Sequence, residues 1–372
     1  MKRVWLRSWL AFCLVACSLA VITSSDVEAT TCPVLAPVCT TTLSWPNTAP
    51  HPPGTPPFPD DVADVYYPNV PASSRKFFKD AFPVVVVLQG AQVDKSFYSQ
   101  FGTRLALSLF VVVIPNHFRS VPTGLPPAPV FTGFFSGSSV VSNALVQVQN
   151  EDNNLSSPLY TADTNTVGLV GHSFGGAAGL YASALDGCAA VPVPPFCEGP
   201  YAHPAGLKAA VFYGTNLVVP INPPPPPPAP QDFVINLNTS GVAVALMQGT
   251  LDGISLPEKA DRTYPTLEDP RGLITIGGAN HYGICNVNCD VNNPCVPPAP
   301  PAPLFPPAPQ PEFSQPTLSQ NEAVARVARW TGLWLRAQLK NDPVAQWWIY
   351  QLEGSLDEVV EVCTEDLAIC QN

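Results

Sequence analysis

The chain has 372 residues, of which 46 are prolines, and a formal net charge of −11 although only 12% of its residues are charged. This length is enough for one large folded domain with a substantial core. The acidic balance excludes the basic face that nucleic acid requires, so we expect no nucleic-acid partner.

The first 29 residues have the features of an export signal. Three basic residues lie within the first seven positions, and the apolar stretch at 9–22 is too short and too early for a good membrane span. Residues 27–29 match the small-x-small rule for cleavage after Ala29. We expect a secreted or periplasmic protein with no later segment that spans a bilayer.

A second interpretation of this region is a lipoprotein signal. Residues 14–17 read Leu-Val-Ala-Cys, which resembles a lipobox and would make Cys17 a lipidated N-terminus. The residues after Cys17 stay apolar where lipoproteins turn polar, which favours simple secretion. A membrane-anchored lipoprotein is therefore the alternative localisation.

The cysteines agree with export. Nine of them follow residue 29, and several have short spacings: Cys32 and Cys39, Cys188 and Cys197, Cys363 and Cys370, and a cluster of Cys285, Cys289 and Cys295. In an oxidising compartment such pairs favour disulfides over metal ligands, although the spacings leave the connectivity open. The odd count predicts one free thiol or an intermolecular link. We expect no metal site and no cofactor.

The most informative motif is Gly171-His172-Ser173-Phe174-Gly175-Gly176. A short apolar run precedes it, and a stretch of small residues that predicts a helix follows. A serine with a glycine two positions away on each side, between strand and helix, is the nucleophile-elbow pattern. Side chains at Gly171 and Gly175 would collide with the neighbouring elements in so sharp a turn, and the strained backbone lifts the Ser173 hydroxyl clear of the sheet.

An acid and a base follow the serine on two further strand-and-loop pairs. A β-rich run ends in the turn that holds Asp252, and a later strand feeds the loop that holds His281. His203 also follows Ser173, but it leaves no room for a strand that carries an acid. The order serine, acid, histidine is that of hydrolases with this elbow. We expect Ser173, Asp252 and His281 to meet at the carboxyl ends of the strands of one sheet.

These residue types indicate a role for each side chain. His281 would accept the proton of Ser173 Oγ, which is a poor nucleophile at neutral pH. Asp252 would hold the imidazole in the required tautomer and stabilise the imidazolium as it forms. Water that His281 deprotonates would then hydrolyse the acyl-enzyme.

An oxyanion hole needs two backbone N–H donors directed at the developing alkoxide. The residue after the nucleophile, Phe174, supplies one of them in this pattern. The second is expected from the loop at 89–91, which follows the β-type run at 83–88. Within that loop we favour the amide of Ala91, and Gln89 is the weaker candidate.

Motifs spread along most of the chain resemble the α/β-hydrolase superfamily from about residue 65 to 350. They read FVVVIPNH at 110–117, GHSFGG at 171–176, LMQGTLDG at 246–253 and GANHYGI at 278–284, beside the run at 84–91. The most similar branch holds dienelactone-hydrolase-like proteins, chlorophyllases, bacterial cutinases with other polyester hydrolases, and platelet-activating-factor acetylhydrolases. The resemblance implies a mainly parallel sheet of about eight strands with helices on both faces. It also implies ester hydrolysis through Ser173, Asp252 and His281.

Two departures from the branch leave its substrate open. Chlorophyllases usually carry a charged residue where Phe174 stands, and the chain lacks the HGGG run of many lipases. Dienelactone hydrolases themselves use a cysteine at the elbow, so Ser173 favours an esterase.

The resemblance and the composition suggest four regions. They are a signal peptide at 1–29, a proline-rich segment at 30–64, the α/β-hydrolase domain at 65–352 and a C-terminal tail at 353–372. Two proline-rich runs, 223–230 and 297–311, interrupt the domain and read as extended surface insertions. Near its end, Ser319 and Glu322 form a capping box that starts the last helix.

The expected function is that of a secreted serine hydrolase of carboxylic esters, with an apolar acyl, lipid or polymeric substrate. The low content of basic residues around the motifs and the aromatic residues beside them favour such a substrate over a charged one. An acyltransferase or a lipid-specific acetylhydrolase would use the same three residues. A non-catalytic binding protein on a hydrolase scaffold is an alternative of another class, against which the complete triad argues.

Overall fold

The structure is a computed structural model that describes residues 32, 36–51, 56–122, 130–190, 196–198, 201–220, 232–290, 309–352 and 354–364. The chain divides into two units, Met1–Thr31 and Cys32–Asn372, and every described residue belongs to the second. The expected signal at 1–29, with Cys17 and Ala29, lies outside the described residues. So do the prolines at 223–230 and most of the run at 297–311.

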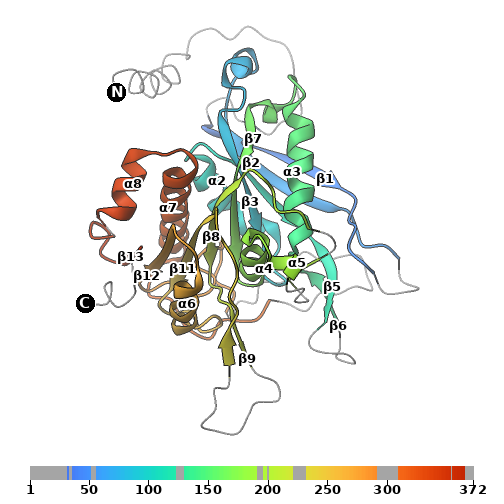
Figure 1. Cartoon of the computed structure of the whole chain (residues 1–372). Coiled ribbons are helices and arrows are strands. Elements are labelled where there is room, and N and C mark those ends of the chain that lie inside the picture. Colours follow the sequence, from blue (N-terminus) through green and yellow to red (C-terminus); the bar gives the residue numbers. More distant parts are fainter. Residues whose placement is uncertain are drawn as a thin grey trace. The chain divides into compact units, whose positions relative to one another are not determined.

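A mostly parallel sheet of nine strands forms the centre of the described unit (Figure 1). Its six inner strands run parallel, and antiparallel strands close both edges. In spatial order the strands are β1 (Val38–Trp45), β2 (Asp61–Pro68), β4 (Val111–Asn116), β3 (Phe82–Leu88), β7 (Ala162–His172), β8 (Leu207–Tyr213), β11 (Ala243–Gly249), β12 (Arg271–Ile276) and β13 (Val360–Cys363). Continuous apolar runs build the inner strands because both of their faces are buried.

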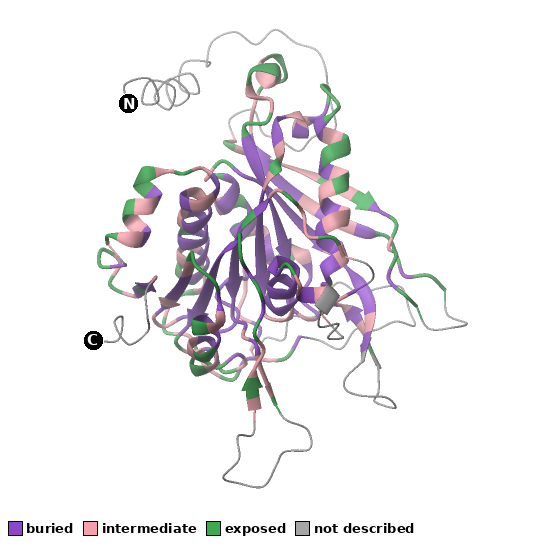
Figure 2. Ribbon diagram, viewed as in Figure 1, coloured by how far each residue is buried: buried purple, intermediate pink, exposed green. Residues whose placement is uncertain are grey.

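Helices cover both faces of this sheet. In β3, Val84 and Val86 belong to one core cluster while Val85 and Val87 belong to the other, because successive side chains of a strand point to opposite faces. Residues of α3, α4 and α6 pack in the first cluster, and residues of α2 and α7 pack in the second. Figure 2 shows the buried strands between helices whose outer sides are exposed. The helices are α2 (Ser99–Ala106), α3 (Ser138–Asp152), α4 (Phe174–Ser183), α5 (Gly187–Ala190), α6 (Pro257–Thr263), α7 (Gln320–Leu339) and α8 (Pro343–Tyr350).

The edges of the sheet differ from the expected domain boundaries. β1 lies within the proline-rich segment expected at 30–64, and β13 lies within the tail expected at 353–372. Both are hydrogen-bonded members of the central sheet, which has nine strands where the family pattern led us to expect about eight. Two smaller antiparallel sheets have two strands each. One pairs β5 (Phe118–Pro122) with β6 (Val130–Phe134), and the other pairs β9 (Val218–Pro220) with β10 (Asp232–Val234).

The last long helix begins where its capping box predicts. The Ser319 hydroxyl accepts the Glu322 backbone N–H at 3.3 Å, and the Glu322 carboxylate accepts the Ser319 backbone N–H at 3.2 Å. α7 then lies along the sheet with Trp330 and Trp334 fully buried beneath it. Over the part of the chain that the structure describes, no helix combines the length and apolarity needed to cross a membrane.

Two of the expected cysteine pairs are disulfides, Cys32–Cys39 and Cys188–Cys197. Cys289 and Cys363 are also disulfide-bonded. Cys295 and Cys370 lie outside the described residues. Cys285 is a buried free thiol, in agreement with the odd count of cysteines.

The order of the strands creates one crevice at the carboxyl edge of the sheet. The chain places β4 on one side of β3 and then returns to place β7 on the other side. The loops that follow β3 and β7 therefore diverge, and open α/β sheets bind their ligands at such a switch point. The loop after β3 carries Ala91, and the turn after β7 carries Ser173.

Candidate active site

Ser173 occupies a strained turn between β7 and α4. Its backbone adopts φ 52° and ψ −119°, a conformation that few non-glycine residues adopt and that is often found at functional sites. A Cβ at Gly171 would lie 2.5 Å from the Gly175 carbonyl oxygen, and one at Gly175 would overlap the backbone of Leu88. The Ser173 N–H donates to the Tyr213 carbonyl at 2.9 Å, which ties the turn to β8. The geometry agrees with the elbow that the glycine spacing predicts.

Asp252 and His281 form a buried pair at the ends of β11 and β12. Their side chains are only 2% exposed, and His281 Nδ1 lies 2.8 Å from Asp252 Oδ2. Oδ2 also accepts a hydrogen bond from the Gln248 amide at 3.0 Å. Oδ1 accepts the backbone N–H groups of Ile254 at 3.0 Å and Ser255 at 2.6 Å. Because four donors fix the carboxylate, it holds the imidazole with Nε2 directed away from the acid.

Ser173 and His281 line one small pocket of about 60 Å³. Among the described hydrogen bonds none joins Ser173 Oγ directly to His281. The pocket is also lined by Ala91, Val93, His172, Ile254, Tyr282 and Gln310. The structure thus brings the predicted nucleophile Ser173, the predicted base His281 and the residue of one predicted oxyanion donor, Ala91, to the same cavity. The predicted acid, Asp252, bonds the Nδ1 atom of the base.

The two backbone amides predicted for the oxyanion hole are those of Phe174 and Ala91. Neither N–H donates a hydrogen bond to another group within the described ranges. Phe174 is the first residue of α4, so the start of the helix favours negative charge beside it. Gln89 does not line the pocket, and its buried side-chain amide has no hydrogen-bond partner among the described residues. The arrangement favours Ala91 over Gln89.

His172 is a buried residue within the elbow motif. It precedes Ser173 in the chain, so the order serine, acid, histidine excludes it as the predicted base. Its Nε2 lies 2.9 Å from the His281 carbonyl oxygen, and its Nδ1 lies 2.9 Å from the Tyr98 hydroxyl. That hydroxyl accepts the Gly90 N–H at 2.8 Å, beside Ala91. His172 therefore connects the loop after β3 with the loop after β12. Burial lowers its pKa well below the usual range, and the nearby His281 lowers it further.

The aromatic residues near the motifs divide into core and site. Of those that suggested an apolar substrate, Tyr98 and Phe101 are fully buried, and only Tyr282 lines the pocket. Phe174 packs against Phe135 and Phe196, with ring centroids 5.2 and 5.0 Å apart. These aromatic contacts stabilise the start of α4.

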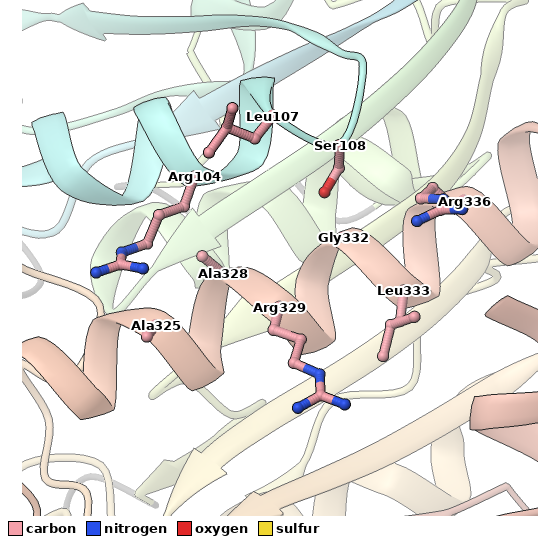
Figure 3. A pocket seen from close by; sticks show the side chains of 9 residues that line it. All are labelled: Arg104, Leu107, Ser108, Ala325, Ala328, Arg329, Gly332, Leu333 and Arg336. Carbon is pink, nitrogen blue, oxygen red and sulfur yellow. The ribbon is translucent and has the colours of Figure 1, made fainter. Parts of the chain in front are cut away.

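A larger groove of about 340 Å³ lies elsewhere, between α2 and α7 (Figure 3). Three arginines, Arg104, Arg329 and Arg336, line it with small and apolar residues. Its described lining residues include no histidine or carboxylate, so they offer no general base of the usual kinds. The described residues also hold no group of three or more histidine, cysteine, aspartate or glutamate side chains that would bind a metal ion. We therefore place the candidate chemistry in the smaller pocket.

Comparisons with known proteins bear on the fold. No family model matches the chain, and no curated protein matches it. Among solved structures, the chain is similar to the ferulic acid esterase from Streptomyces cinnamoneus determined at 2.4 Å resolution, with a TM-score of 0.50 and 17% sequence identity. The match covers 89% of this chain and 98% of the esterase chain. At this identity the similarity establishes the fold alone. Together with the strand order it confirms the expected α/β-hydrolase fold.

Proposed function

We propose that this α/β-hydrolase-fold chain is a serine hydrolase of carboxylic esters. The observation that carries the proposal is the shared pocket of Ser173 and His281, with His281 bonded to the buried carboxylate of Asp252. This is the set of groups that general-base activation of a serine needs.

In the proposed reaction Ser173 Oγ attacks the ester carbonyl carbon while His281 Nε2 takes its proton. The carbonyl oxygen becomes an oxyanion that the Phe174 and Ala91 amides stabilise. The imidazolium returns the proton to the leaving alcohol, which departs and leaves an acyl-enzyme. Water, deprotonated by His281, then attacks the acyl carbon and releases the acid and free Ser173. Asp252 keeps Nδ1 protonated throughout.

The pocket lining supports an uncharged, apolar acyl group. Ala91, Val93, Ile254 and Tyr282 supply apolar surface, and the described residues that line the cavity include no lysine or arginine. A volume of about 60 Å³ suits a short acyl group or the end of a longer chain.

The disulfides are compatible with secretion, which we propose as the location. The cutinase, chlorophyllase and acetylhydrolase branch that the motifs resemble also stays a proposal. A panel of acyl chain lengths, polyester films and chlorophyll tests it.

The test of the function compares wild type, Ser173→Ala and the exposed control Ser355→Ala on p-nitrophenyl acetate. We expect Ser173→Ala to lose turnover with its fold retained, and Ser355→Ala to match wild type. A fluorophosphonate probe should label wild type, and peptide mapping should locate the adduct on Ser173. Undiminished turnover by Ser173→Ala, or no labelling of wild type, refutes the proposal and in the second case favours a non-catalytic scaffold. Product analysis with added alcohols separates hydrolysis from acyl transfer.

A further inference from the structure

A segment that follows the second proline-rich run lies against the loop that carries His281. We name residues 309–318 the bracing segment. The Asn280 side-chain amide donates to the Ser314 carbonyl at 3.1 Å, and the Thr317 N–H donates to the Gly278 carbonyl at 2.9 Å. Gln310, from the same segment, lines the pocket of the candidate site. A part of the chain without a recognised motif is therefore bonded to the catalytic loop.

The centre of this contact is the carboxylate of Glu312, which is fully buried. Its Oε2 accepts the Gly253 N–H at 3.1 Å and the His281 N–H at 3.4 Å. Its Oε1 accepts the Ser314 N–H at 2.8 Å. Among the described ion pairs none involves Glu312. Backbone amides alone satisfy it, which suits an acceptor-only carboxylate.

Two of these amides belong to the two loops of the proposed acid and base. Gly253 directly follows Asp252, and the other amide is that of His281 itself. One oxygen atom therefore bonds both loops, 59 and 31 residues away in the sequence. The approach is close, since a Cβ at Gly253 would lie 2.7 Å from Glu312 Oε1. The Glu312 backbone N–H in turn donates to the Cys289 carbonyl at 2.9 Å, and this bond fixes the backbone of Glu312.

We propose that Glu312 is a positioning residue for the reaction at Ser173, because it holds the Asp252 loop and the His281 loop at a fixed separation. This inference rests on the proposed function. Glu312 touches neither the substrate nor the reacting atoms, and acts through the backbones that carry the acid and the base. Its negative charge, bonded to the His281 backbone, also favours the imidazolium that forms as Ser173 attacks.

The substitution Glu312→Gln exposes this role because it keeps the shape and changes one acceptor into a donor. If the amide oxygen faces the two loops, the NH₂ group opposes the Ser314 N–H, and this repulsion displaces the oxygen atom that both loops share. If the oxygen faces Ser314, the NH₂ group opposes the N–H groups of both Gly253 and His281 and pushes the loops apart. A displacement of about 1 Å in a catalytic group lowers the rate by up to about 100-fold. Substrate binding in the pocket does not use Glu312.

The experiment measures kcat and KM for p-nitrophenyl acetate with wild type, Glu312→Gln and the control Glu361→Gln. Glu361 is an exposed glutamate on β13, so its substitution removes the same charge without touching either loop. Complete labelling with a fluorophosphonate counts the active molecules, so that kcat is expressed per reactive serine. We expect kcat of Glu312→Gln to fall about 10- to 100-fold with KM within about twofold of wild type. Glu361→Gln should match wild type in both constants.

One outcome overturns the inference: a kcat of Glu312→Gln, per reactive serine, within about twofold of wild type. A loss that comes only from fewer reactive molecules gives this outcome, since a purely structural role would lower their number and leave each survivor fully active. A rise in KM at constant kcat gives it as well. If Ser173→Ala loses activity while Glu312→Gln keeps it, only this inference fails. If Ser173→Ala stays active, the proposed function fails with it.

Discussion

Replacement of Asp252 by asparagine tests the proposed triad most directly. All four groups that bond the carboxylate are donors: the His281 Nδ1–H, the Gln248 amide, and two backbone N–H groups. An asparagine has only one acceptor oxygen, so its NH₂ group must face some of these four donors. The backbone donors at 2.6 and 3.0 Å cannot turn away, and the amide oxygen therefore faces them.

The NH₂ group of the variant then faces His281. It donates to Nδ1, which must become the unprotonated nitrogen, and the proton of the neutral ring moves to Nε2. A ring in this tautomer cannot accept the proton of Ser173. The same change of tautomer in a serine protease triad lowers kcat about 10⁴-fold, which corresponds to about 5 kcal/mol of transition-state stabilisation. We expect a loss of this size with little change in KM and a retained fold, because the side chain keeps its volume.

The assay measures turnover of p-nitrophenyl acetate together with thermal unfolding. Asp232→Asn is the matched control, since Asp232 is an acid on β10 that pairs with Arg262 and does not line the pocket. The control should keep wild-type activity. More than about one tenth of wild-type kcat in a folded Asp252→Asn variant refutes the tautomer argument, because a loss of that size needs less than about 1.4 kcal/mol.

Three further predictions concern buried residues. Burial lowers the pKa of His117, but hydrogen bonds to Asp61 and Glu198 outweigh it and raise the pKa to about 9. The resulting stabilisation is complete below about pH 6.5 and is lost as the pH rises through 9. Urea unfolding over this range should show that the free energy of unfolding decreases by up to about 3 kcal/mol in wild type, and that His117→Gln removes this decrease. Equal decreases in wild type and variant would contradict the prediction. His172→Phe removes the acceptor of the buried Tyr98 O–H and the donor to the buried His281 carbonyl, so the free energy of unfolding should fall by about 2 to 4 kcal/mol, and an unchanged urea midpoint would count against the connection. Gly175→Ala forces a methyl group into backbone atoms, so we expect a loss of at least about 2 kcal/mol or no soluble protein, and normal expression with wild-type stability would show that the turn relaxes.

The sequence predicts the parts of this site that have a local signature. Ser173, Asp252 and His281 each follow a short β-type run at a turn, so their places in strand and loop can be read one at a time. The parallel arrangement of β7, β11 and β12 then brings the three turns to one edge of the sheet. The glycine spacing of the elbow also has a local cause, because the turn itself excludes side chains at those positions.

Other parts have no local signature. Glu312 lies next to a proline-rich run and nothing about its neighbours marks it, because its partners are backbone amides far away in the sequence. β1 and β13 are edge strands whose pairing depends on the completed sheet, so the composition of the sequence places them in flanking segments. His172 is visible in the motif, but only the packing of Tyr98 and the His281 loop around it gives it a role.

Two of the groups that hold the His281 loop, His172 and Glu312, differ in charge, and this difference suits the proposed reaction. A backbone carbonyl only accepts, so His172 must carry its proton on Nε2 and accept the Tyr98 hydroxyl proton at Nδ1. Its ring is thus neutral, and its lowered pKa keeps it so although the His281 ring lies only 4.9 Å away. A charged His172 would oppose the imidazolium that forms when Ser173 attacks. Glu312 holds the same loop by its backbone with a carboxylate, which favours that imidazolium. A neutral imidazole at the His281 carbonyl and an acid at the His281 N–H fix the base without disfavouring its protonated form.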